Sequence, residues 1–135
     1  MRRKLLAGGW VGGLVVAAAT SLVAHHSLSA EFDVNKPITF TGTITQVDWT
    51  NPHIYTHVEV TGTDGSKIVY KVEGGAPNSL FREGLRKETL QTGSVVTVTG
   101  LRAKNPTSTN IGQAVIVLPD GRKLVGPGSG RGGGQ

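Results

Sequence analysis

Four histidines are the residues of this sequence best suited to metal chemistry, and they fall into two pairs. His25 and His26 are adjacent, whereas His53 and His57 are four residues apart. Imidazole suits copper, nickel and zinc, and copper binds nitrogen sites most tightly of the common divalent ions. If the chain is cut after Ala24, His25 can chelate through both its α-amino group and its ring. The sequence therefore suggests a copper-type site formed by His25 with His26 or His53.

Such a site would resemble the histidine brace of copper proteins. Asn35-Lys36-Pro37 could turn the chain, and ten extended residues reach about 33 Å, so residues 25–34 could run back towards His53. His53 and His57 would stand roughly 13 Å apart on one strand, too far to hold one ion together. The alternative is that the first pair belongs to a frayed terminus and the second pair forms ordinary surface contacts.

A second set of candidates lies in two polar segments that each contain an Asn-Pro pair. An aromatic ring beside amides and a cation can hold a sugar, a peptide or another small polar ligand. The alternative is that the Trp belongs to the core and that the Asn-Pro pairs only break strands. The candidate ligand-binding residues are Trp49, Asn51, His53, Tyr55, Lys104 and Asn105.

The first 24 residues have the pattern of a secretory signal peptide. Arg2, Arg3 and Lys4 precede an uncharged run that extends to Ala24, which is the order of a charged region, an apolar region and a cleavage site. Paired arginines also fit a twin-arginine signal loosely. The run is about long enough to serve instead as a membrane anchor, but its glycines favour cleavage and a periplasmic or secreted protein.

Composition limits the classes of function that remain. Three positive charges leave with the signal, so the net charge falls from +5 to +2, which argues against a nucleic-acid partner. The chain has no cysteine, which excludes thiol catalysis and cysteine-ligated metal sites. It also lacks a Gly-x-Ser-x-Gly elbow, a His-Glu-x-x-His motif and a Walker loop. We therefore expect a non-enzymatic protein.

The elements that would position these residues are mainly strands. Alternation of apolar and polar residues predicts strands over 38–45, 53–60, 67–73, 94–101 and 111–118. The first strand changes phase between Ile44 and Val47, which predicts a bulge or a sharp bend. Pro77 and Gly84 are typical of the start and the stop of a short helix.

Three strands, a short helix and two further strands are typical of a five-stranded Greek-key barrel of the oligonucleotide/oligosaccharide-binding (OB) type. An open β-sandwich is the competing fold. In the OB arrangement, the segments around Asn51 and Asn105 would border one binding face. We predict a signal peptide over 1–24, an N-terminal extension over 25–36, the all-β OB-like barrel over 37–125 and a disordered Gly-rich tail over 126–135.

Several short segments resemble a family of small exported bacterial proteins that carry a domain-of-unknown-function label. They are Ala24-His25-His26-Ser27, Ala30-Glu31-Phe32-Asp33, Asn35-Lys36-Pro37, Trp49-Thr50-Asn51-Pro52-His53, Gly75-Ala76-Pro77-Asn78, Ala103-Lys104-Asn105 and Leu118-Pro119-Asp120-Gly121-Arg122-Lys123. The resemblance covers nearly all of the chain after the signal, except the Gly-rich end. It implies export and a β-barrel domain, and it brings no activity or catalytic residue with it.

Three functions agree with these features. The first is an exported OB-like module that binds a small polar ligand near the two Asn-Pro segments. The second is a periplasmic metal-binding protein that holds copper through His25 with His26 or His53. The third is an envelope stress protein or a structural partner of an envelope protein.

Overall fold

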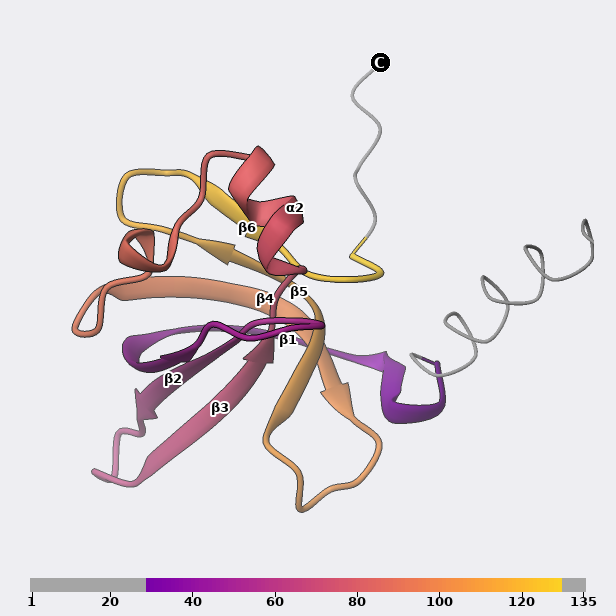
Figure 1. The fold of residues 1–135 in the computed structure, drawn as a ribbon. Coiled ribbons are helices and arrows are strands. Elements are labelled where there is room, and N and C mark those ends of the chain that lie inside the picture. The colour runs from indigo at the N-terminus through magenta and orange to yellow at the C-terminus, as the bar shows by residue number, and fades with distance from the viewer. Residues whose placement is uncertain (1–28, 130–135) are drawn as a thin grey trace, which may run out of the picture.

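The computed structural model of the protein describes residues 29–129 (Figure 1). This part of the chain forms one mostly antiparallel sheet with a helical turn at residues 29–31, a short α-helix and a 3-10 helix. Within these residues, no helix is both long and apolar enough to cross a membrane. The elements are β1 (Phe32–Asp48), β2 (Tyr55–Thr61), β3 (Lys67–Glu73), α2 (Pro77–Arg82), η1 (Lys87–Thr89), β4 (Val95–Ala103), β5 (Asn110–Val117) and β6 (Lys123–Val125).

The sheet has the strand order β3-β2-β1-β4-β5-β6, and β3 also pairs with β5. That additional pairing is parallel and joins Lys71 to Asn110 and Val72 to Ile111. Five strands therefore form a closed circuit, in which β1 pairs with β2, β2 with β3, β3 with β5, β5 with β4, and β4 with β1. The prediction of an all-β chain is confirmed as a mostly antiparallel sheet. The prediction of five strands missed β6, which pairs with the end of β5.

The first strand serves both sides of this circuit because it is long and bent. Its first part pairs with β4 from Phe32 to Thr43, and its second part pairs with β2 from Thr43 to Asp48. The register with β2 shifts between Ile44 and Gln46, so Thr45 is the extra residue of a bulge. The predicted phase change is therefore confirmed, and it marks the place where the strand changes partner.

Ordered packing extends beyond both predicted ends of the domain. β1 begins at Phe32 rather than Ile38 and continues through Asn35-Lys36-Pro37, so those residues do not turn the chain back along the strand. The Phe32 ring is buried directly against Gly112, where an added Cβ would lie 2.3 Å from it. At the other end, Gly126 is buried and its amide donates to the Ala114 carbonyl. Ordered packing therefore extends past the predicted start of the tail.

The core lies between the inward faces of the strands and α2. Alternating residues of β2 and β4 point inward, which is the burial pattern that their sequences predict. Pro77 begins α2, and Gly84 follows the helix with a φ of +82°, the left-handed conformation that glycine adopts without a steric cost. The buried residues of the core are Ile44, Ile54, Val58, Val72, Leu80, Leu85, Leu90, Val96, Val98, Ile111, Ala114, Ile116, Leu118 and Leu124.

Candidate functional site

A group of polar side chains crosses the outer face of the sheet where β1 ends and β2 begins. Asp48 lies opposite Tyr55, and Tyr55 lies opposite Glu73 on β3. Two residues further along β2, His57 lies opposite Lys71 on β3. Directly opposed residues point to the same face of a sheet. With His53 from the preceding loop, they form the polar cluster, which consists of Asp48, His53, Tyr55, His57, Lys71 and Glu73.

The first contact of the polar cluster joins β2 to the end of β1. His57 Nε2 lies 2.8 Å from Asp48 Oδ2, and Gln46 Nε2 donates a 2.6 Å hydrogen bond to Asp48 Oδ1. Hydrogen bonds from Gln46 and His57 hold the pKa of the Asp48 carboxyl below its ordinary value. The pair is partly open to water, because the side chains of His57 and Asp48 are 22% and 35% exposed.

The second contact joins the loop before β2 to the end of β3. His53 Nδ1 lies 2.7 Å from Glu73 Oε1, and the Glu73 side chain is only 13% exposed. The neighbouring backbone fixes His53 in place, because Ile54 N donates to Gly75 O at 3.1 Å and Gly74 N donates to Ile54 O at 2.9 Å. The Asn51–Pro52 peptide bond in this loop is cis. The loop therefore presents His53 at the junction between β2 and the segment that leads to α2.

The aromatic member of the cluster lies between the two contacts. The Lys71 ammonium sits 4.3 Å from the centre of the Tyr55 ring, within the range of a cation–π interaction. Partial burial and the negative charges of Glu73 and Glu31 raise the pKa of the Tyr55 hydroxyl. Tyr55 therefore offers a protonated hydroxyl at neutral pH, and its ring face is already covered by Lys71.

A cavity of about 350 Å³ opens beside His53, between α2 and residues 125–129. Two glycines of its wall are packed closely against their neighbours. An added Cβ at Gly75 would lie 3.3 Å from Leu80, and one at Gly126 would lie 2.6 Å from the Glu73 carbonyl oxygen. In Figure 1, α2 lies beside β6 at the opposite end of the molecule from the β4–β5 loop. The cavity is lined by His53, Gly75, Ala76, Ser79, Glu83, Val125, Gly126, Pro127, Gly128 and Ser129.

The predicted ligand-binding residues do not all meet at one place. His53 and Tyr55 belong to the polar cluster, and both lie next to Glu73. Trp49 is half-buried and packs against the core, which is the alternative that the sequence left open for it. Asn51 is exposed in the turn before His53.

Lys104 and Asn105 hold other parts of the chain. The Lys104 amide donates to Glu31 O at 2.9 Å, and its ammonium donates to Ser29 O at 2.6 Å. Asn105 Oδ1 accepts hydrogen bonds from the amide and the hydroxyl of Thr107, at 3.0 and 2.8 Å. Among residues 29–129, no hydrogen bond joins Lys104 or Asn105 to the polar cluster. The two Asn-Pro segments therefore have separate hydrogen-bond partners, although Glu31, whose carbonyl accepts from Lys104, is near enough to Tyr55 for its charge to raise the pKa of the Tyr55 hydroxyl.

The predicted metal ligands lie partly outside the described residues. His25 and His26 precede Ser29, and the structure describes neither. His53 and His57 pair with different carboxylates. Between residues 29 and 129, no group of three or more His, Cys, Asp or Glu side chains could hold a metal ion.

Sequence reasoning missed the two histidine–carboxylate pairs. Neither Asp48 nor Glu73 was predicted to contact a histidine. Glu59, two residues from His57 on the same strand, accepts a 2.8 Å hydrogen bond from Lys67. The bulge at Thr45 brings Asp48 to the face of His57, and the β2–β3 register brings Glu73 opposite Tyr55. The outward alternation of His57 was a usable signal, but its partner depended on the register.

Residues 13–112 match a family of unknown function, DUF6152. The chain belongs to this family. The match extends from before the described residues to Gly112 on β5, so it includes the whole polar cluster. No curated protein and no solved structure matches the chain. The function therefore has to be argued from the site itself.

Proposed function

We propose that this member of DUF6152 is an exported, non-enzymatic binding module whose five-strand circuit is an OB-like barrel. The order of three strands, a short helix and two strands supports the barrel, as does the parallel pairing between β3 and β5. Export, to the periplasm or out of the cell, rests on the signal-like pattern of residues 1–24.

The site of binding in this proposal is the cavity beside His53. The observation that carries it is the contact between His53 and the nearly buried Glu73, which sets the imidazole at the edge of the 350 Å³ cavity. A space of this size suits a small ligand. Because Glu73 holds Nδ1, the orientation of the ring is fixed before any ligand arrives. A preorganised side chain costs less entropy on binding.

The side chains around the cavity indicate the class of ligand. Among the described residues, the polar side chains that line it are those of His53, Ser79, Glu83 and Ser129, and none of them is a lysine or an arginine. Hydroxyl, imidazole and carboxylate groups accept hydrogen bonds from hydroxyl and amine groups. The proposed ligand is therefore a small polar molecule that carries hydroxyl or ammonium groups, such as a sugar or an amine.

Nuclear magnetic resonance tests the proposal with a panel of neutral sugars and primary amines. We expect a member of the panel to shift the amide signals of Ser79 and Gly126, and His53→Ala to abolish that shift. His57→Ala is the matched control, because it removes the other histidine–carboxylate pair and leaves the cavity intact. The proposal fails if no compound shifts these signals, or if His57→Ala weakens binding as much as His53→Ala.

A copper-type metal site is the second proposal, and one contact favours it. Glu73 holds His53 Nδ1, which leaves Nε2 as the nitrogen for a metal. A carboxylate that orients an imidazole in this way is common behind metal-binding histidines. His25 or His26 would supply the remaining nitrogen ligands.

Titration with Cu²⁺, followed by electron paramagnetic resonance, separates the two proposals. Nitrogen hyperfine splitting that weakens in both His25→Ala and His53→Ala would support the metal site. Equal copper affinity in a variant with one extra residue before His25 would exclude chelation by the terminal amino group.

A further inference from the structure

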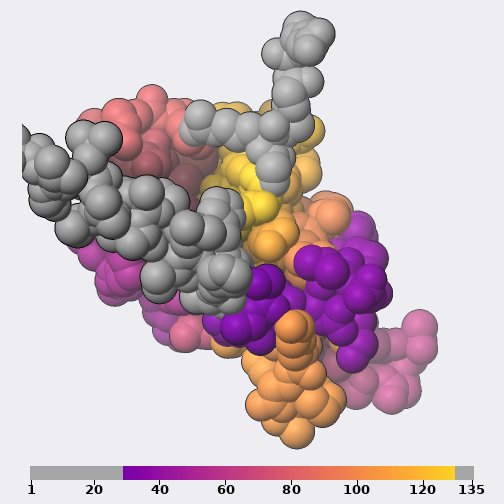
Figure 2. All heavy atoms as spheres, turned by 90° about the vertical axis from the view of Figure 1, so that its right-hand side faces the viewer, coloured from indigo at the N-terminus to yellow at the C-terminus, as the bar shows by residue number. Residues whose placement is uncertain are grey.

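We propose a second site, independent of the one beside His53, that binds a phosphate group between the start of β1 and the β4–β5 loop. A cavity of about 200 Å³ lies there, lined by Lys36, Arg102, Ala103, Asn105, Pro106 and Ser108. Figure 2 shows the β4–β5 loop, in orange, projecting beside the indigo first part of β1. The cavity is smaller than a typical small-molecule pocket, so it suits a single anionic group.

Every polar side chain that lines this cavity can donate a hydrogen bond. Asn105 uses its carbonyl oxygen to accept from Thr107, which leaves its Nδ2 group as a donor. Ser108 uses its oxygen to accept from Asn110 N at 3.2 Å, which leaves its hydroxyl hydrogen free to donate. Both side chains therefore still have a hydrogen-bond donor for an acceptor such as a phosphate oxygen.

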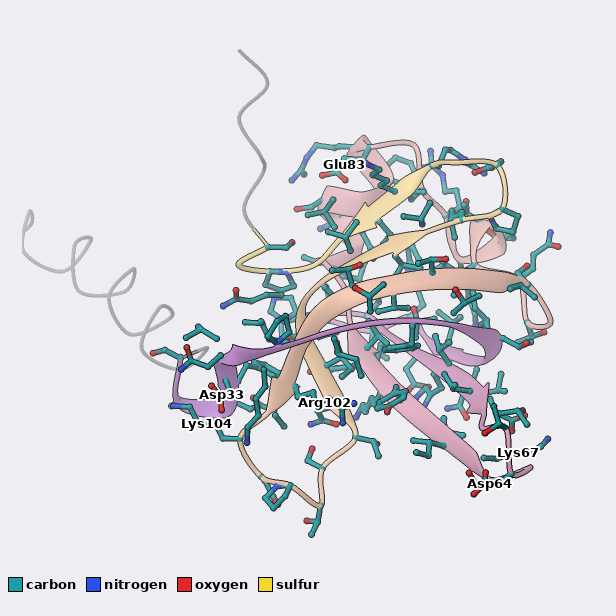
Figure 3. The ribbon with its side chains drawn as sticks, turned by 180° about the vertical axis from the view of Figure 1, so that it is seen from behind. Asp33, Asp64, Lys67, Glu83, Arg102 and Lys104 are labelled. Carbon is teal, nitrogen blue, oxygen red and sulfur yellow. The ribbon has the colours of Figure 1, made fainter. Side chains whose placement is uncertain are left out.

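Two cations add positive charge to the same cavity. Arg102 is exposed on β4, and it makes no ion pair with any residue in the range 29–129. Its planar guanidinium matches two oxygens of a phosphate group at once. Figure 3 labels Arg102 above the β4–β5 loop, with Lys104 further towards the start of β1.

Lys36 has one competing partner. Its ammonium lies 3.6 Å from Asp33 Oδ2, with the Lys36 side chain 58% exposed. An exposed pair of this kind contributes little, typically below about 1 kcal/mol. Asp33 is not among the residues that line the cavity, and the polar side chains that do line it, within residues 29–129, all carry a hydrogen-bond donor. The cavity beside His53 differs in charge, because its lining within the same residues includes Glu83 and no lysine or arginine.

The phosphate group could belong to free inorganic phosphate or to a lipid headgroup. Titration with inorganic phosphate against chloride at equal ionic strength tests the first source, with the side-chain NMR signals of Arg102 and Asn105 as the readout. Flotation with vesicles of phosphatidylglycerol, compared with vesicles of phosphatidylcholine, tests the second source. Binding in either experiment that depends on Arg102 supports the site and identifies its source.

Charge-matched variants separate a built site from general attraction. We expect Arg102→Gln to weaken phosphate binding roughly tenfold or more, since it removes a charge-assisted pair of hydrogen bonds. Arg102→Lys should weaken it less, and Asp33→Asn should strengthen it by releasing Lys36. Lys123→Gln, an equal change of charge on the exposed start of β6, is the control.

The proposal is overturned if wild-type protein binds neither phosphate nor anionic vesicles, or if Lys123→Gln loses as much binding as Arg102→Gln. Arg102 is exposed on its strand, so its variants are expected to fold, and an unchanged melting temperature verifies this. His53→Ala should leave phosphate binding intact, which makes failure of this site distinguishable from failure of the other.

Discussion

The two parts of β1 have outer faces of opposite character, although they belong to one strand. Along the first part, Thr39 lies opposite Thr99 and Thr41 lies opposite Thr97 on β4, and both pairs of hydroxyl oxygens are 3.1 Å apart. Along the second part, the Asp48 carboxylate contacts His57 on β2 and accepts a hydrogen bond from Gln46. From Thr39 to Thr41 the first face is a neutral threonine ladder, and the second face contributes Asp48 to the charged polar cluster.

The bulge at Thr45 produces this difference. Before it, odd-numbered residues of β1 point outward and Ile38 and Phe40 point inward. After it, Gln46 and Asp48 point outward and Val47 packs against the core. A shift of one residue moves every following side chain to the other face of a sheet. The bulge thus keeps Val47 in the core and brings Asp48 to His57.

In the proposed function, His53 is the residue of the polar cluster that contacts the ligand, and the threonine ladder has a structural role only. Each threonine pair in the ladder shares one hydrogen bond between its hydroxyls. The cluster combines a preorganised imidazole with a neighbouring cavity. Four predictions, which use five substitutions on β1 and on the strands paired with it, test whether the two parts of β1 differ in this way.

The largest effect is expected from truncation in the core beneath the bulge. Ile44 is 1% exposed and belongs to the central core, whereas Ile38 on the first part of β1 is only partly buried. Ile44→Ala should lower the free energy of unfolding by about 3 kcal/mol, and Ile38→Ala by about half as much. Urea denaturation measures both. Equal urea midpoints for the two variants would contradict the expectation that Ile44, on the second part, contributes more to stability than Ile38.

A smaller effect of opposite sign is expected at Thr56. Its side chain is fully buried opposite Val47, and its hydroxyl has no hydrogen-bond partner within the described part of the chain. Thr56→Val removes the unsatisfied hydroxyl and keeps the shape of the side chain. We expect the free energy of unfolding to stay unchanged or to rise by about 1 kcal/mol. A clear loss of stability in urea would show that the hydroxyl has a partner in solution.

The next effect depends on pH and is specific to the polar cluster. The pKa of Asp48 lies below its ordinary value of 3.8 in the folded protein, because Gln46 and His57 donate to the carboxylate. A lowered folded-state pKa adds stability above the unfolded-state value, and that stability is lost as pH falls through the folded-state value. Asp48→Asn lacks this contribution, so it should destabilise the protein by less than about 1 kcal/mol at neutral pH.

Urea midpoints of Asp48→Asn and wild type should therefore converge as the pH falls below 3.8. The same series on a threonine-ladder variant should show a difference from wild type that does not change with pH. A constant gap between Asp48→Asn and wild type at every pH would mean that the carboxylate is not stabilised by its neighbours.

Much of the fold follows from local pattern. Strict alternation identified β3 with its observed ends, Pro77 identified the start of α2, and the change of phase after Ile44 predicted the bulge. These features depend on residues close together in the chain. Apolar residues recur every two positions in a strand and every 3.6 positions in a helix, so the sequence pattern shows these features directly. The separate character of the two parts of β1 could also be anticipated, because the threonines end where the phase changes.

Long-range pairing explains what the sequence did not show. β6 contains only Lys123, Leu124 and Val125, too few residues for an alternating pattern, and it forms because β5 offers a free edge. His53 and Glu73 are twenty positions apart, and their contact depends on the β2–β3 register. Lys104 and Asn105 were predicted to border the same binding face as His53. Lys104 instead donates hydrogen bonds to the backbone of Ser29 and Glu31, and the side-chain oxygen of Asn105 accepts from Thr107.

The smallest effect is expected in the threonine ladder itself. Thr97→Val removes one hydroxyl of the pair with Thr41 and keeps a β-branched side chain, which suits a strand. Thr41 keeps access to water as its alternative partner, because its side chain is exposed. The free energy of unfolding should therefore change by less than about 0.5 kcal/mol, and the binding of polar ligands beside His53 should not change. A loss of ligand binding would place the ladder within the binding surface, and the division of β1 at its bulge would then be structural but not functional.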